Sequence, residues 1–221
     1  MNEATPEAYN EINRQIAASC KITSRSRDAV QLIAVSKTRK GDEILPLLNA
    51  GHRVFGENRV QEAQDKWPAL KADFPDVELH LIGQLQSNKA DEAVATFDYI
   101  HALDRISLVK ALGKAMRDQS KSVPCFLQVN IGEEEQKGGC AIADIPALLN
   151  AAKGEGVPII GLMCLPPADI EPAPFFALLA ELAARHGLSQ LSMGMSDDFG
   201  TAIMLGATHI RVGTALFGNR A

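Results

Sequence analysis

Long apolar runs, basic clusters and metal-type cysteine motifs are all missing from this chain of 221 residues. No apolar stretch approaches the roughly 20 residues of a membrane span, and residues 1–21 look like a polar helix without a signal peptide's apolar centre. The 22 Lys and Arg against 27 Asp and Glu give a net charge of -5, and no basic cluster could neutralise a run of phosphates. We therefore expect a soluble, cytoplasmic protein that binds neither membrane nor nucleic acid.

Cysteine and tyrosine are scarce as well. The four cysteines form no C-x-x-C pair and have no histidine nearby at metal-ligand spacing, so the sequence predicts no metal site. We expect all four thiols to be reduced, with Cys125 and Cys164 in the core because they lie inside apolar, strand-like runs. The only tyrosines are Tyr9 and Tyr99, which limits the acid and base groups available for catalysis.

Eight short apolar runs with β-branched residues recur along the chain, and a helix-like amphipathic stretch follows most of them. The runs span residues 31–36, 53–56, 79–83, 99–103, 124–130, 158–165, 190–195 and 209–217. No linker or low-complexity segment separates them, which favours a single domain over residues 1–221, a closed (β/α)8 TIM barrel with an extra N-terminal helix. An open doubly wound sheet is the alternative, but the first strand lacks the G-x-G-x-x-G turn of the dinucleotide-binding version of that fold.

Polar residues stand where many of the predicted strands end, and in a barrel those ends meet at the ligand-binding rim. These residues are Ser36, Lys37, Glu57, Asn58, Gln84, Asp104, Asn130, Ser196 and Thr214. Lys37 draws attention because a lysine ending an apolar strand would place its amine at the mouth of the barrel, where desolvation favours its use as a nucleophile. Such an amine can trap an aldehyde. The alternative is a solvated lysine that begins a loop together with Arg39 and Lys40.

The last two strands predict a phosphate site, because barrels commonly bind phosphate after strands seven and eight. Gly213 would let the backbone approach an anion, and the hydroxyls of Ser196 and Thr214 would donate hydrogen bonds. Helix capping is the alternative for Ser196. The carboxylates of Asp197 and Asp198 follow directly and would repel a phosphate unless they point away.

Seven segments together resemble the pyridoxal phosphate homeostasis protein family, and they run from the first strand to the last. They are residues 34–37 (AVSK), 55–62 (FGENRVQE), 80–89 (HLIGQLQSNK), 128–132 (QVNIG), 161–163 (GLM), 191–198 (LSMGMSDD) and 206–218 (GATHIRVGTALFG). The departures are small: Gln84 stands where the family more often has proline, and Ile131 replaces the usual threonine. The resemblance covers nearly the whole chain and implies a barrel similar to that of alanine racemase.

The resemblance also implies a cofactor, pyridoxal 5'-phosphate (PLP), held as a Schiff base on Lys37. It assigns the phosphate to Ser196, Gly213 and Thr214, and it also gives Met193, in the same segment as Ser196, as a cofactor-binding residue. Arg211 would face the pyridine nitrogen, and a guanidinium that stays protonated leaves that nitrogen unprotonated. The alternative for Arg211 is pairing with a nearby acid. Asn58 matches a residue at the edge of the cofactor, and helix capping explains it equally well.

The expected role is that of a PLP carrier in vitamin B6 homeostasis without substrate turnover. A PLP-dependent racemase needs a second base opposite the lysine. The resemblance to alanine racemase implies that this base would be a tyrosine from another subunit, supported by an additional β-domain. Tyr9 falls in the N-terminal helix and Tyr99 at the wrong end of the fourth strand, and the chain stops at Ala221, soon after the eighth strand. Racemase-like catalysis, a Schiff-base aldolase and a purely structural role remain the alternatives. PLP-dependent apo-enzymes are the expected partners, and a monomer is expected.

Overall fold

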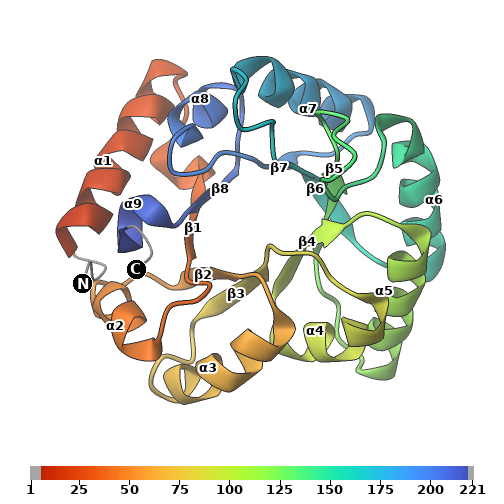
Figure 1. Cartoon of the computed structure of the whole chain (residues 1–221), viewed down its shortest axis with the longest axis horizontal. Coiled ribbons are helices and arrows are strands. Elements are labelled where there is room, and N and C mark those ends of the chain that lie inside the picture. The colour runs from red at the N-terminus through yellow and green to blue at the C-terminus, as the bar shows by residue number, and fades with distance from the viewer. Residues whose placement is uncertain (1–5, 219–221) are drawn as a thin grey trace.

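A closed barrel of eight parallel strands, in the order β1 to β8, forms the centre of the computed structural model, which describes residues 6–218. Helices surround the strands on the outside (Figure 1). The strands are β1 (Gln31–Val35), β2 (Val54–Glu57), β3 (Glu78–Leu81), β4 (Tyr99–Leu103), β5 (Cys125–Val129), β6 (Ile159–Cys164), β7 (Gln190–Ser192) and β8 (His209–Val212). The (β/α)8 prediction is therefore confirmed, and the pairing of β1 with both β2 and β8 closes the barrel.

The helices alternate with the strands, as a right-handed β–α–β path requires. They are α1 (Pro6–Ile22), α2 (Gly41–Asn49), α3 (Val60–Asp73), α4 (Ala90–Thr96), α5 (Ile106–Asp118), α6 (Ile145–Glu155), α7 (Ala173–Arg185), α8 (Phe199–Met204) and α9 (Thr214–Phe217). The predicted N-terminal helix is α1, which packs beside α8 and α9 (Figure 1). Across the described residues, none of these helices combines the length and apolarity needed to cross a bilayer.

The main hydrophobic core lies between the strands and the surrounding helices. Leu32 and Ala34 of β1 contribute to it, as do Ile44 of α2 and Leu108 of α5, and all four are buried. Strands of a parallel barrel are covered on the outside by helices and filled on the inside by one another, so β5 is buried along its whole length. Polar groups are nevertheless buried with the strands, including His80, His101, Ser192 and Arg211.

The last two strands, β7 and β8, end earlier than the sequence predicted. The apolar runs placed their ends at residues 195 and 217, and both of these predicted boundaries were wrong. β7 ends at Ser192, and Gly194 then adopts a φ of +95°, which takes the chain out of the ladder. β8 ends at Val212, whose partner on β1 is Ala34. Beyond it, residues 214–217 coil into the one-turn helix α9, in which the N–H groups of Leu216 and Phe217 donate to the carbonyl of Gly213.

Candidate functional site

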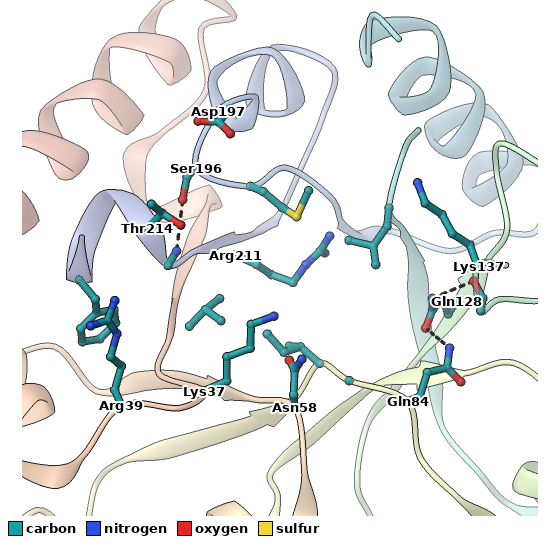
Figure 2. Close-up of a pocket in the computed structure, with 18 of the residues that line it drawn as sticks. Lys37, Arg39, Asn58, Gln84, Gln128, Lys137, Ser196, Asp197, Arg211 and Thr214 are labelled. Atoms are coloured by element: carbon teal, nitrogen blue, oxygen red, sulfur yellow. Dashed lines mark hydrogen bonds between the residues drawn. The ribbon is translucent and has the colours of Figure 1, made fainter. Parts of the chain in front are cut away.

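A pocket of about 550 Å³ opens at the mouth of the barrel, where the carboxyl ends of the strands meet. Figure 2 shows side chains from opposite sides of the barrel converging on it. The polar and charged lining residues are Lys37, Arg39, Asn58, Gln84, Gln128, Gln136, Lys137, Ser196, Asp197, Arg211 and Thr214. Six of the seven residues predicted for the site, Gly213 among them, thus line this pocket.

Lys37 follows β1 directly, and its half-buried side chain extends into the pocket. In Figure 2 its amine points toward Arg211, and Asn58 lies beside it. Lys40, by contrast, is exposed and stands at the N-cap of α2. The location of Lys37 therefore suits a nucleophilic amine better than the alternative of a solvated loop lysine.

The turn that carries Lys37 is fastened to α3. Thr38 has a φ of +63°, a conformation that β-branched residues rarely adopt, and its N–H donates to the carboxylate of Glu62. The ammonium of Lys66 donates to the carbonyl of Ser36 at 2.9 Å and to that of Arg39 at 3.0 Å. Both sides of the turn are therefore held by one α3 side chain, which fixes the direction of Lys37.

A buried carboxylate, Glu57 at the end of β2, lies beneath this turn. One of its oxygens lies 2.7 Å from Lys66 Nζ, and the same oxygen accepts hydrogen bonds from the Ser36 hydroxyl at 2.7 Å and the Trp67 indole at 3.0 Å. Burial raises the pKa of Glu57, and Lys66 and these hydrogen bonds counter that effect only in part. Sequence reading placed Glu57 at the rim but gave no sign of this pairing.

Ser196 links the ends of β7 and β8. Its hydroxyl oxygen accepts a hydrogen bond from the N–H of Gly213 at 3.3 Å (Figure 2). It also accepts one from the N–H of Ala215 at 3.4 Å. Ser196 does not cap α8, since that helix begins at Phe199 with Asp198 as its N-cap. Two backbone N–H groups thus converge with two hydroxyls, those of Ser196 and Thr214, at one edge of the pocket, and this is a donor arrangement that suits an anion.

The two acidic residues after Ser196 do not occupy this donor cluster. Asp198 accepts a 2.6 Å hydrogen bond from the N–H of Met195, and burial raises the pKa of its carboxyl group. Asp197 lies at the pocket's outer edge, and in Figure 2 its carboxylate points away from Lys37 and Arg211. The predicted conflict between these carboxylates and an anion is thereby avoided.

Arg211 is buried on β8 and faces the pocket opposite Lys37 (Figure 2). Its guanidinium donates to the Ser192 hydroxyl at 2.6 Å and to the carbonyl of Cys164 at 2.9 Å. Burial lowers the pKa of Arg211, but a guanidinium starts from so high a value that it stays protonated. Within the described residues its hydrogen-bond partners are neutral, so the alternative of an ion pair with an acid does not hold.

Of two further residues predicted to bind the cofactor, Asn58 lines the pocket and Met193 does not. Asn58 lines the pocket and is not a helix cap, because α3 begins at Val60 with Arg59 as its N-cap. Met193 is fully buried and lies outside the pocket lining, which contains Met195 instead. Gly194 between them has a φ of +95°, which breaks the strand geometry that would put residues 193 and 195 on the same face.

Several lining residues were missed by sequence reading. Lys137 lies in the loop after β5, where it donates to the carbonyl of Pro166 at 2.9 Å and pairs with Glu134 at 2.6 Å. Gln128 on β5 connects Gln84 at 3.5 Å with the carbonyl of Gly138 at 3.0 Å (Figure 2). The only available signal was their location in or beside strand-to-helix loops.

In the described part of the chain, no group of three or more His, Cys, Asp or Glu side chains is arranged to hold a metal ion. All four cysteines are free and buried, as expected of reduced core thiols. Burial raises the pKa of Cys140 and of Cys164 to about 12. Such thiols are inert rather than nucleophilic at neutral pH.

Known proteins match this chain over nearly its full length. Residues 13–221 match the family model described as alanine racemase, N-terminal domain. The pyridoxal phosphate homeostasis protein of Pseudomonas aeruginosa is 39% identical, covering 97% of this chain and 95% of its own, and that of Escherichia coli K12 is 33% identical, covering 95% and 94%.

Solved structures agree with these sequence matches. PipY of Synechococcus elongatus, in a structure with PLP bound, superposes with a TM-score of 0.80 at 40% identity, covering 94% of this chain and all of PipY. Alanine racemase of Clostridium difficile superposes with a TM-score of 0.74 at 11% identity, covering 99% of this chain and 58% of the racemase. The second match shows a shared barrel fold.

Proposed function

This chain belongs to the alanine racemase N-terminal domain family and, within it, to the pyridoxal phosphate homeostasis proteins, and from that premise we propose that it holds PLP at the barrel mouth as part of intracellular PLP homeostasis. One observation carries the proposal: an amine, an anion-type donor cluster and a buried guanidinium face one another across a single pocket. PLP would bring an aldehyde that condenses reversibly with an amine, a phosphate and a pyridine nitrogen.

Each part of the pocket suits one part of that ligand. Lys37 is the attachment point for the aldehyde carbon, because its amine extends into the pocket from a turn that α3 holds in place. Ser196, Thr214 and the backbone of Gly213 bind the phosphate, which would replace the long contacts that the Ser196 hydroxyl now makes. Asn58 lies at the edge of the ligand beside Lys37.

Arg211 is the partner of the ring nitrogen. Its fixed positive charge lets it donate a hydrogen bond to that nitrogen but not take a proton from it, so the ring stays unprotonated. An unprotonated pyridine ring is a weaker electron sink than one paired with an acid. The pocket is thereby suited to holding PLP rather than to activating a substrate.

A racemase-like role would require a second acid–base group facing Lys37. Tyr9 is in α1, where its ring packs 5.3 Å from that of His52, and Tyr99 begins β4 at the opposite end of the barrel from the pocket. The amine of Lys137 is engaged at the pocket wall by Glu134 and by the carbonyl of Pro166. These placements support a carrier that transfers or buffers PLP for apo-enzymes.

Borohydride reduction tests the attachment point. The purified protein is incubated with PLP, reduced, digested and mapped by mass spectrometry, with Lys37→Ala and the matched loop variant Lys40→Ala in parallel. We expect one modified peptide containing Lys37, a visible absorption band that reduction removes, and loss of both only in Lys37→Ala. Labelling centred on Lys40, or spread evenly over surface lysines, would overturn the assignment.

A further inference from the structure

A continuous row of hydrogen bonds runs across the barrel interior from the pocket floor toward the opposite end. The guanidinium of Arg211 on β8 lies 2.6 Å from the Ser192 hydroxyl on β7, and that oxygen lies 2.8 Å from Nδ1 of His101 on β4. Nε2 of His101 lies 2.8 Å from Nδ1 of His80 on β3. Nε2 of His80 in turn lies 2.8 Å from the carboxylate of Glu78.

The Glu78 end of this row fixes the direction of its bonds when both imidazoles are neutral. Arg211 can only donate, so the Ser192 oxygen accepts from it, which leaves the Ser192 hydroxyl proton available for Nδ1 of His101. An ionised Glu78 can only accept, so His80 carries its proton on Nε2 and accepts at Nδ1 from Nε2–H of His101. Two neutral imidazoles are therefore both protonated at Nε2, and the Ser192 hydroxyl, which accepts from Arg211, donates to Nδ1 of His101.

Burial and charge agree with that assignment. His80 and His101 are fully buried, which lowers the pKa of each imidazole and keeps both neutral. The hydrogen bond from His80 lowers the pKa of Glu78, whose carboxylate also accepts from the Gln31 amide at 2.8 Å. The end of the row farthest from the pocket is therefore the Glu78 carboxylate, which is held in place by hydrogen bonds from His80 and Gln31.

Ring stacking fixes the planes of the two imidazoles. His101 stacks on Phe126 with ring centroids 4.3 Å apart, and His80 stacks on Tyr99 at 4.5 Å with an interplanar angle of 5°. A third histidine, His209, touches the same rings but is hydrogen-bonded to Thr208 rather than to the row. Neither His80 nor His101 can rotate without losing both a stacking contact and a hydrogen bond.

We propose that His101 and His80 are positioning residues that hold the Arg211 guanidinium in its pocket-facing orientation through this one-directional row. Since the Ser192 oxygen is already committed to donate to His101, its acceptor side is turned to Arg211 and anchors one end of the guanidinium. The carbonyl of Cys164 anchors another nitrogen. The consequence for PLP rests on the proposed function, in which Arg211 faces the ring nitrogen.

The row itself is testable without any ligand. Nitrogen-15 NMR of the ligand-free protein at neutral pH should show His80 and His101 as neutral imidazoles protonated at Nε2, each with a bare Nδ1. Replacing Ser192 by alanine should alter the Nδ1 resonance of His101 first. Protonation of either imidazole at Nδ1 in the wild-type protein would overturn the proposed direction, whatever the protein binds.

The positioning role is tested with His101→Phe, which keeps a ring stacked on Phe126 but removes both hydrogen bonds. His209→Phe is the matched control, because it makes the same replacement in the same ring cluster but outside the row. We expect His101→Phe to weaken PLP retention about tenfold, the scale of one charge-assisted hydrogen bond, and to shift the nitrogen-15 resonance of ring-labelled PLP, with His209→Phe unchanged. Ser192→Ala provides a second break in the row should His101→Phe fold poorly.

The outcomes separate the two proposals. Suppose that the wild-type protein retains PLP and that the three variants, His101→Phe, Ser192→Ala and His209→Phe, show equal retention and equal ring-nitrogen resonances. That result would refute the positioning role and leave the proposed function intact. Failure of the wild-type protein to retain PLP would instead count against the proposed function. The tautomers measured in the ligand-free protein would then still decide whether the row exists.

Discussion

The ammonium of Lys66 and the carboxylate of Glu57 form a buried ion pair at 2.7 Å directly beneath the turn that carries Lys37. Side-chain exposure is 9% for Lys66 and 0% for Glu57, so water screens the pair little. Because Lys66 also holds the backbone carbonyls of Ser36 and Arg39, stability and the direction of Lys37 depend on the same group.

Replacing Lys66 by methionine should therefore cost both stability and PLP retention. Removing one partner of a buried pair leaves the other charge uncompensated, which typically costs about 3–5 kcal/mol. Urea denaturation measures the loss. Lys114→Met is the control, because its pair with Asp118 is exposed and its loss should change the free energy of unfolding far less than loss of the buried pair. Equal losses in the two variants would show that the buried pair does not anchor the turn.

Replacing Ser196 by alanine should loosen PLP without unfolding the barrel. The hydroxyl belongs to the proposed phosphate cluster, and losing one such hydrogen bond weakens binding by about 1–3 kcal/mol. Equilibrium dialysis measures PLP retention, with exposed Ser189 at the other end of the barrel providing the matched Ser189→Ala control. Unchanged retention in Ser196→Ala would place the phosphate elsewhere.

His52 should make the protein less stable in mild acid. Burial lowers the pKa of His52 to about 4 in the folded state from an ordinary value of 6.5, so between these values the unfolded chain binds a proton that the folded chain does not. The contribution of neutral His52 to the free energy of unfolding is fully present above pH 6.5. It is lost as the pH falls toward 4, which lowers the free energy of unfolding by about 3 kcal/mol.

The measurement is urea denaturation at a series of pH values between 7 and 4, comparing wild type with His52→Gln. Glutamine can keep a donor for the carbonyl of Val54, which His52 contacts at 2.7 Å, but it does not titrate. We expect a shallower decline in the variant. Parallel declines would mean that His52 is not the group responsible.

With PLP bound, the protein should turn over common amino acids no faster than a trace rate. Neither tyrosine lines the pocket, the carboxylate of Asp197 points away from Lys37, and the amine of Lys137 is held by Glu134 and by the carbonyl of Pro166. Steady-state assays for racemisation, transamination and decarboxylation, with Lys37→Ala as control, provide the measurement. A Lys37-dependent rate of roughly 1 per second or more would restore the racemase-like interpretation.

The sequence predicted the barrel and most of the pocket because both follow from strand ends. Parallel strands of a closed barrel end at one rim, so Lys37 after β1 and Thr214 after β8 had to approach each other once the fold was assigned. Ser196 joined them for the same reason. Strand ends predicted this grouping, whereas the role of each residue in it came from the family resemblance.

Features that depend on register or helix rotation were not predictable. His80 and His101 looked like ordinary members of apolar strands, and they meet because β3 pairs with β4 so that His80 lies opposite Tyr99. Lys66 reaches Glu57 only because α3 turns that face of the helix toward β2. The amphipathic pattern locates such a helix but does not say which polar side chain at its edge enters the barrel wall.

The polar filling of the barrel has a consequence for how this chain tolerates sequence change. An ordinary barrel interior of aliphatic layers accepts single substitutions of similar volume, whereas each member of the row from Arg211 to Glu78 satisfies a neighbour. One apolar replacement leaves buried partners unsatisfied, and replacing neighbouring members together leaves fewer such partners than replacing them one at a time. Positions 80, 101 and 192 should therefore vary in concert among relatives, with single changes rarer than paired ones.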